Sequence, residues 1–192
     1  MLTNTSIKTE YNNIIVSPIA GSLGAEIQNI NLSQKVSDEI MSEIYQALLD
    51  YQVIFFRDQK FDPASQKIFA EKIGKPIVYP FVKGLEDFPE ITPILKKETD
   101  INNFGGIWHS DTTYQENPPM GTMLYALETP QFGGDTEFAN QYLAYERLSD
   151  GMRKFLDTLE GVNISGKSRV AKTRSDIMKH ASVGLKGDEL TA

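Results

Sequence analysis

Near its N-terminus the chain has two apolar stretches separated by glycines. Residues 13–20 read NIIVSPIA and are typical of a strand, and the glycine-containing residues 21–24 predict a turn. Residues 25–32, AEIQNINL, alternate between apolar and polar side chains, which is the period of a strand with one buried face. The pattern therefore predicts two strands joined by a tight turn.

A helix is predicted after these strands because apolar residues then recur every four positions. Ile40, Ile44 and Leu48 fall on one face of a helix, and Ser37 is a suitable N-cap ahead of two acidic residues. Acidic side chains in a first turn interact favourably with the positive end of the helix dipole. A short apolar strand, residues 53–56 (VIFF), is expected next.

A second helix and a long loop are predicted in the middle of the chain. Asp62 and Pro63 suit the N-cap and first position of a helix that ends near Gly74. Residues 75–106 are rich in Pro, Gly and Asn and show no regular period. Loops of this length commonly carry function or are mobile. We therefore expect this segment to be a mobile lid over the open side of a site.

The second half of the chain shows a weaker alternation of strand and helix patterns. Residues 120–127 (MGTMLYAL) and 136–139 are expected to be strands, with a turn at the glycines of residues 133–135 between them. A helix is expected over residues 141–159, with a break at Gly151.

The composition is that of a globular protein, and it excludes several functions. The 192 residues suit one domain, and 40% of them are apolar. A net charge of −7 disfavours a nucleic-acid partner, and the absence of cysteine excludes disulfides and cysteine chemistry. No apolar run approaches the roughly 20 residues of a membrane helix, and residues 1–12 lack a secretory signal pattern. We therefore expect a cytoplasmic protein with no membrane partner.

The residues with the most evident chemistry are His109 and Asp111, in the sequence WHSD. Side chains two positions apart in a strand point to the same side, so an imidazole and a carboxylate could hold one metal ion together. Because each would lie about 2.0–2.2 Å from the ion, we expect their ligating atoms to lie about 3 Å apart. Two histidines and one carboxylate on one face of Fe(II) leave the other face open for substrate and oxygen. The alternative is a surface histidine bonded to a neighbouring aspartate, because His-x-Asp is a short pattern that occurs often by chance.

The segment that follows His109 carries several motifs in a definite order. The WH-x-D motif is followed by Pro118–Pro119, an apolar stretch, Gly-Gly-Asp-Thr at residues 133–136 and Tyr-Glu-x-Leu-Ser at residues 145–149. In this order and spacing the motifs resemble the taurine dioxygenase (TauD/TfdA) family of iron(II)- and 2-oxoglutarate-dependent dioxygenases. The resemblance covers most of residues 20–150.

The resemblance implies a fold that is mainly β with flanking helices, a double-stranded β-helix or jelly roll that is present here only in part. Short strands separated by turn residues agree with it. It also implies Fe(II) held by His109 and Asp111, and 2-oxoglutarate as cosubstrate, with its distal carboxylate bonded by Thr136. The implied oxidoreductase consumes oxygen, releases succinate and carbon dioxide and hydroxylates an unactivated C–H bond. No side chain need act as a catalytic acid or base.

Three positions bear on the substrate that the resemblance implies. Tyr79 matches a tyrosine that contacts taurine in the family, whereas Pro76 and Gly105 stand where taurine dioxygenase has a histidine and an asparagine. We therefore expect a small, anionic organic substrate (a sulfonate, phosphonate or carboxylate) other than taurine.

The C-terminal part departs from the family. The family has a second metal-binding histidine, followed by an arginine that pairs with 2-oxoglutarate. The only other histidine here is His180, with no arginine after it and Arg174 before it. We therefore expect residues 1–192 to be a single incomplete domain, whose open strand edges favour a homo-oligomer. The alternatives are a catalytically inactive truncated fragment of such an enzyme and a cupin-like metal enzyme.

Overall fold

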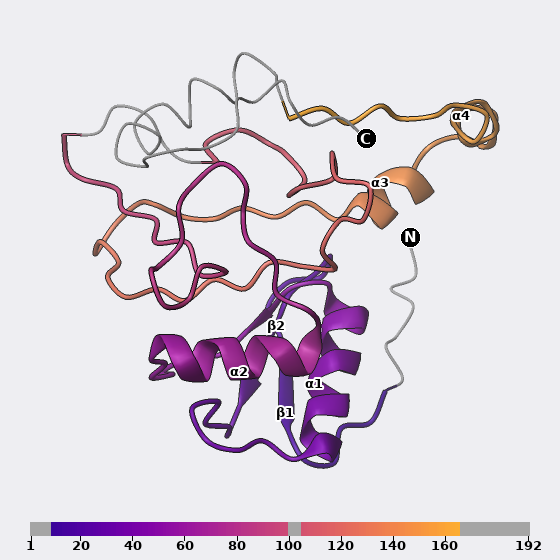
Figure 1. The fold of residues 1–192 in the computed structure, drawn as a ribbon. Coiled ribbons are helices and arrows are strands. Elements are labelled where there is room, and N and C mark those ends of the chain that lie inside the picture. Colours follow the sequence, from indigo (N-terminus) through magenta and orange to yellow (C-terminus); the bar gives the residue numbers. More distant parts are fainter. Residues whose placement is uncertain (1–8, 100–104, 166–192) are drawn as a thin grey trace. The chain divides into compact units, whose positions relative to one another are not determined.

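The computed structural model describes residues 9–99 and 105–165, and Figure 1 shows its fold. His180 and Arg174 lie outside these residues, and so do residues 176–181, whose sequence pattern predicts a helical turn.

The chain divides into two compact units, and each is described by itself. The first unit is formed by Met1–Ile73 and Tyr125–Leu159, and it contains the helices and strands of the described residues. The second unit is formed by Gly74–Leu124 and Glu160–Ala192. Its described residues form loops around a small aromatic cluster.

The first unit contains a three-stranded sheet with β2 at its centre. Strand β1 (Ile15–Pro18) pairs antiparallel with β2 (Ala25–Gln28), and β2 pairs parallel with β3 (Ile54–Phe55). Within β2, Ala25 and Ile27 are buried while the residues after them are more exposed, which confirms the predicted alternation. All three strands lie within the predicted ranges but are shorter.

The turn between β1 and β2 requires a glycine at its end. The backbone N–H of Ile19 donates to the carbonyl of Gly24 at 3.0 Å. Gly24 has a φ of +93°, and a Cβ placed there would lie 3.0 Å from a side-chain carbon of Ile19. A residue with a side chain would be strained here, so the predicted turn is confirmed at the one glycine that its geometry demands.

Helix α1 (Asp38–Tyr51) connects β2 to the parallel strand β3 and covers the sheet (Figure 1). It begins at Ser37, whose hydroxyl accepts a hydrogen bond from the backbone N–H of Ile40, as predicted. Ile44 is fully buried at the centre of its apolar face. The buried residues of this face are Met41, Ile44 and Ala47.

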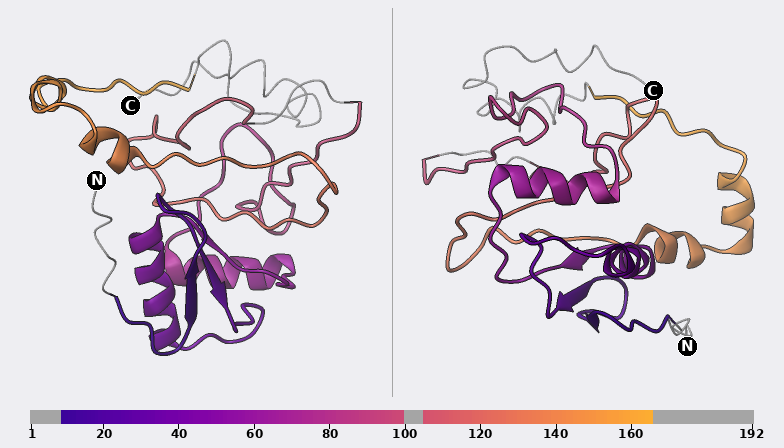
Figure 2. Two further views of the ribbon diagram at one scale, coloured as in Figure 1. Left: turned by 180° about the vertical axis from the view of Figure 1, so that it is seen from behind. Right: turned by 60° about the horizontal axis from the view of Figure 1, so that its bottom comes forward.

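Helix α2 (Pro63–Ile73) contacts α1 and runs across the direction of the strands in Figure 2. The Asp62 carboxylate accepts a hydrogen bond from the backbone N–H of Ser65 at 2.7 Å, so the predicted N-cap is confirmed. The single buried residue of α2 is Phe69, whose ring lies edge-on to that of Phe56. This aromatic contact attaches the helix to the segment that follows β3.

Two carboxylates of α1 bond the segment before β1. Asp50 accepts a hydrogen bond from the hydroxyl of Tyr11 at 2.7 Å, and Glu43 bonds the backbone. Glu43 accepts hydrogen bonds from the backbone N–H groups of Asn12, Asn13 and Ile14, at 2.9 to 3.2 Å. Partial burial acts to raise the pKa of Glu43, but these hydrogen bonds outweigh it and hold the pKa below the ordinary value of 4.5. The charged form of Glu43 therefore stabilises the folded N-terminal segment.

The strands predicted at residues 120–127 and 136–139 are wrong for the described residues, which contain more helix than strand and are not mainly β. A strand persists only when its backbone groups are paired, and neither segment has a hydrogen-bonded strand beside it in this part of the chain. Tyr125 is instead fixed by its side chain. Its hydroxyl donates to the carbonyl of Gln59 at 3.1 Å, and its ring lies edge-on to Phe61.

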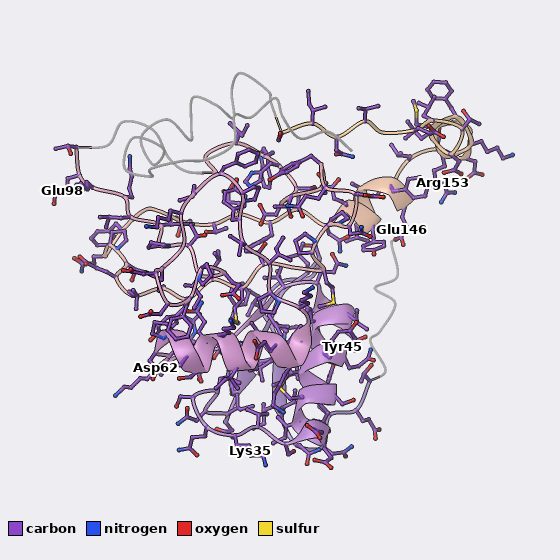
Figure 3. All side chains as sticks on the ribbon, in the orientation of Figure 1. Lys35, Tyr45, Asp62, Glu98, Glu146 and Arg153 are labelled. Carbon is purple, nitrogen blue, oxygen red and sulfur yellow. The ribbon has the colours of Figure 1, made fainter. Side chains whose placement is uncertain are left out.

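The helix predicted over residues 141–159 is two short helices, α3 (Gln141–Glu146) and α4 (Asp150–Leu156). The predicted break at Gly151 is wrong, because Gly151 lies inside α4. The break lies just before Ser149, whose hydroxyl caps the first turn of α4. Neither helix has a buried residue, and Figure 3 shows the side chains of α4, Arg153 among them, pointing outward.

The loop predicted over residues 75–106 has neither helix nor strand in its described part, as expected. Its mobility stays a prediction. Of the helices in residues 9–99 and 105–165, none has the length and apolar composition that crossing a bilayer requires.

A compact turn within this loop depends on Gly84. The backbone N–H of Leu85 donates to the carbonyl of Ile91, and that of Ile91 donates to the carbonyl of Phe88, both at 2.9 Å. These bonds bring Pro89 so close to Gly84 that an added Cβ would lie 2.1 Å from the Pro89 carbonyl oxygen. The contact is with backbone, so the turn cannot relax by moving a side chain.

Glu43→Gln is expected to lower the free energy of unfolding by about 1 kcal/mol at pH 7, because an amide accepts hydrogen bonds less strongly than a carboxylate. The folded-state pKa is depressed, so this contribution is present above about pH 4.5 and is lost as the pH falls through the folded pKa. Denaturant unfolding from pH 7 to pH 3 measures the free energy of unfolding of both proteins. The difference between them should disappear at acid pH, and a difference that does not change with pH would contradict the role of the Glu43 carboxylate. Glu146→Gln, at an exposed position of α3, is the control.

Gly84→Ala is expected to open the turn that Leu85 and Ile91 close, at a cost of about 1–3 kcal/mol. Hydrogen–deuterium exchange measures the opening of the turn as a loss of protection at the Leu85 amide. The control is Gly121→Ala in the same unit, because a Cβ there meets no atom within 4 Å. Equal protection of Leu85 in both variants would show that the backbone contact is absent.

Candidate metal centre

His109 and Asp111 lie in the second unit, in a segment without helix or strand. The distance between His109 Nε2 and Asp111 Oδ1 is 3.0 Å. We expected about this separation between an imidazole and a carboxylate that share a metal ion. The strand geometry from which we predicted it is absent, so other contacts must hold the two side chains together.

One of these contacts fixes the imidazole of His109. Its Nδ1 lies 2.6 Å from the backbone carbonyl of Ile107. A carbonyl can only accept, so Nδ1 carries the hydrogen and donates it. In the neutral imidazole, Nε2 then presents its lone pair, which is the form in which histidine binds metals.

The consequence is that two hydrogen-bond acceptors face each other. Nε2 of His109 and the carboxylate oxygen of Asp111 converge, and two lone pairs at 3.0 Å repel unless a cation lies against both. That cation is either a proton, which makes an imidazolium–carboxylate ion pair, or a metal ion bound by both atoms. An imidazole nitrogen with a carboxylate oxygen suits Fe(II), so the donor set fits the metal that the sequence motifs imply.

Two contacts fix the surroundings of the pair. The hydroxyl of Thr122 donates to the second carboxylate oxygen of Asp111, Oδ2, at 2.8 Å. Gly105 lies beside the ring, where an added Cβ would be 3.3 Å from Cε1 and 3.8 Å from Nε2 of His109. The position that we expected to bear on substrate choice is therefore next to the His109 imidazole.

The chain just after the pair is anchored in the core of the second unit. Tyr114 is buried against Phe81, which has no exposed surface, and Val82 completes the cluster. Between Asp111 and Tyr114 the backbone turns sharply at Thr112, which has a φ of +50°. The aromatic anchor and the turn limit the freedom of the Asp111 backbone.

Tyr79, the predicted substrate-binding residue, belongs to the same unit as the pair. Its ring packs edge-on against Phe81, with 5.6 Å between ring centres. It also lines a hollow of about 310 Å³ together with Lys83 and Glu86. The substrate role of Tyr79 stays a prediction.

Thr136, the predicted 2-oxoglutarate residue, lies in the first unit, whereas the His109–Asp111 pair lies in the second. Thr136 is exposed and follows two glycines, Gly133 and Gly134, that both have a φ of +77°. The chain bends at residues 131–132 and not at residues 133–135, so the turn predicted there is not confirmed. The cosubstrate role of Thr136 stays a prediction.

A third protein ligand is absent from the described part of the chain. Residues 9–99 and 105–165 contain no group of three His, Cys, Asp or Glu side chains placed to hold one metal ion. His180 and Arg174, which the sequence analysis considered, lie outside these residues.

Sequence reasoning missed the two groups that orient the pair. The Ile107 carbonyl is a backbone atom, and no sequence pattern announces it. Thr122 left a signal, because Thr122 and Tyr125 are the two residues with a side-chain hydroxyl in the apolar stretch of residues 120–127, and each hydroxyl has a specific partner. That signal could have identified Thr122 as a residue with a specific partner.

Comparisons with known proteins agree on one family. A profile of the taurine catabolism dioxygenase TauD, TfdA family matches residues 15–186. The chain is 33% identical, over 163 residues, to the alpha-ketoglutarate-dependent sulfate ester dioxygenase of Pseudomonas putida, a match that covers 84% of this chain and 53% of that protein. It is 32% identical to the alkylsulfatase of Acinetobacter baylyi, covering 83% of this chain and 50% of that protein.

A solved structure supports the same conclusion. The crystal structure of a taurine dioxygenase from Burkholderia xenovorans is similar to this fold with a TM-score of 0.65 and 31% sequence identity, over 80% of this chain and 54% of that one. The chain thus spans about half the length of the relatives it matches. Because the family profile covers the chain from β1 to residue 186, the chain belongs to the taurine catabolism dioxygenase TauD, TfdA family.

Proposed function

We propose that this chain supplies part of the active site of an Fe(II)- and 2-oxoglutarate-dependent dioxygenase, which hydroxylates a small anionic organic substrate. The observation that carries the proposal is the 3.0 Å approach of His109 Nε2 to Asp111 Oδ1, with Nδ1 of the same ring committed to the Ile107 carbonyl. Family membership supports it. The same family match removes the cupin-like alternative.

The chain's own residues have distinct tasks in this proposal. Nε2 of His109 and Oδ1 of Asp111 bind the metal, and the Thr136 hydroxyl donates to the distal carboxylate of 2-oxoglutarate. Bound Fe(II), with 2-oxoglutarate and oxygen, supplies the oxidising chemistry that hydroxylates a C–H bond. The protein residues bind and orient the reactants, and none needs to act as a general acid or base.

The substrate class follows from the relatives and from the position beside His109. The relatives are named for sulfate esters, sulfonates and 2,4-dichlorophenoxyacetate, which are all organic anions. This agrees with a sulfonate, phosphonate or carboxylate and adds sulfate esters. Tyr79 is the residue of the second unit that we propose for substrate contact. Gly105 and Pro76 do not supply the polar groups expected for taurine.

The jelly roll also belongs to the proposal. The described residues form a three-stranded sheet with flanking helices, and the similar solved structures belong to this dioxygenase family. We infer that residues 120–127 and 136–139 become strands when strands of the barrel lie beside them. A single domain, a cytoplasmic location and a homo-oligomer stay predictions.

A second candidate is a fragment that is catalytically inactive on its own. It is favoured by the absence of a third ligand among the described residues and by the half-length match to the relatives. The two candidates share the metal-binding pair and differ in turnover, so metal binding and succinate release have to be measured separately.

Metal titration tests the pair. The chain is expected to bind one Mn(II) or Co(II) ion, used as oxygen-stable substitutes for Fe(II), and Asp111→Ala should weaken binding more than about tenfold, because even partners of metal ligands have effects of that size. Isothermal titration calorimetry measures both. Glu116→Ala, which removes an exposed carboxylate from the same unit, should leave the affinity unchanged. Equal binding by the Asp111 and Glu116 variants would refute the pair.

Succinate release tests turnover by the 192-residue chain. With Fe(II), 2-oxoglutarate and oxygen, we expect a rate near background. Losing a charge-assisted partner for the cosubstrate carboxylate weakens binding by about 2–5 kcal/mol, and a missing metal ligand adds to that loss. Release at an ordinary enzymatic rate would show that the chain completes its own site, with His180 as the first residue to substitute.

A further inference from the structure

The two oxygens of the Asp111 carboxylate have different partners. Oδ1 lies 3.0 Å from Nε2 of His109, and Oδ2 accepts a hydrogen bond from the hydroxyl of Thr122 at 2.8 Å. The side chain of Asp111 is half-exposed, so the carboxylate has space to rotate. The Thr122 hydroxyl is the hydrogen-bond donor that the described residues provide for Oδ2.

This difference matters for a metal that must keep open positions. A carboxylate binds a metal through one oxygen or through both, and the second mode occupies an additional coordination position. A metal held by two histidines and one carboxylate oxygen retains three positions for other ligands. A hydrogen bond to the second oxygen favours the one-oxygen mode, because that oxygen would have to give up its donor to reach the metal.

We propose that Thr122 is a positioning residue that holds Oδ2 of Asp111 away from the metal, so that only Oδ1 binds beside His109. The inference rests on the proposed function of the pair, but it concerns a residue outside the ligand set. With the Ile107 carbonyl fixing His109 and the Thr122 hydroxyl fixing Asp111, each ligand has one orienting partner.

The surroundings of Thr122 argue against a purely structural role. Its side chain is exposed, so its removal leaves no cavity in a core. The Thr122 hydroxyl has a defined partner, Asp111. Valine has the same shape as threonine, so packing alone does not require the hydroxyl.

Thr122→Val and Thr122→Ser separate the hydroxyl from the shape of the side chain. Valine keeps the shape and removes the donor, whereas serine keeps the donor. The control Thr113→Val removes the hydroxyl of a neighbouring threonine that bonds Asn163 at 3.2 Å. Mn(II) affinity by calorimetry and the visible absorption of bound Co(II), which responds to the number and geometry of donor atoms, are measured for all four proteins.

Thr122→Val is expected to weaken Mn(II) binding by about tenfold, the lower end for an orienting partner that is exposed to solvent. It should also change the Co(II) spectrum, and Thr122→Ser and Thr113→Val should match the parent chain in both measurements. Equal affinity and an unchanged spectrum in Thr122→Val would overturn the proposal. An equal loss of affinity in Thr113→Val would also overturn it, by showing a general effect of the loop.

Crystal structures of the metal-free parent and Thr122→Val proteins make the test independent of metal binding. We expect one orientation of the Asp111 carboxylate in the parent and more than one in the variant. If the parent binds no metal, the proposed function fails, and these structures still decide whether Thr122 orients Asp111. If the parent binds metal and Asp111 keeps one orientation in the variant, the positioning role fails alone.

Discussion

The ordered part of the first unit depends on the backbone pairing of strand β2. β2 is hydrogen-bonded to β1 on one side and to β3 on the other, and its residues Ala25 and Ile27 are buried. A parallel partner cannot be reached through a tight turn, so the chain has to cross the sheet between β2 and β3. Helix α1 makes that connection and buries Ile44 in doing so. The sheet thus determines where the first helix lies and which of its faces is buried.

The fold was predictable from the sequence where its cause is local. Ser37 and Asp62 cap helices within a few residues of themselves, and Gly24 ends the turn after β1 through its own positive φ. Residues 120–127 have a strand-like composition, but a strand also needs a second backbone beside it, and that requirement cannot be read from the segment itself. The misplaced helix break has a different cause. Glycine is tolerated inside α4, whereas the Ser149 hydroxyl caps the first turn and so sets where the helix begins.

The candidate site also has features that the sequence predicts and features that it does not predict. The identities of His109 and Asp111 and their separation could be predicted, since the motif order indicated a metal pair and ligand chemistry sets the distance. The groups that orient them could not, because a backbone carbonyl and a hydroxyl eleven positions away act through the folded loop. Thr136 shows a further limit. The two glycines before it adopt positive φ angles, whereas its proposed partner is a small molecule that no local pattern describes.

The backbone conformation of Gly105 restricts which side chains can stand beside Nε2 of His109. Its φ of +71° is a conformation that glycine adopts freely, that asparagine and aspartate tolerate, and that β-branched and bulky residues avoid. The residues that suit this position are therefore glycine, which has no side chain, and residues with a short polar side chain. Related proteins with this loop geometry would alternate between an open space and a single hydrogen-bonding group at the same point. One substitution at residue 105 would then add or remove a hydrogen-bonding group beside His109 without rebuilding the loop.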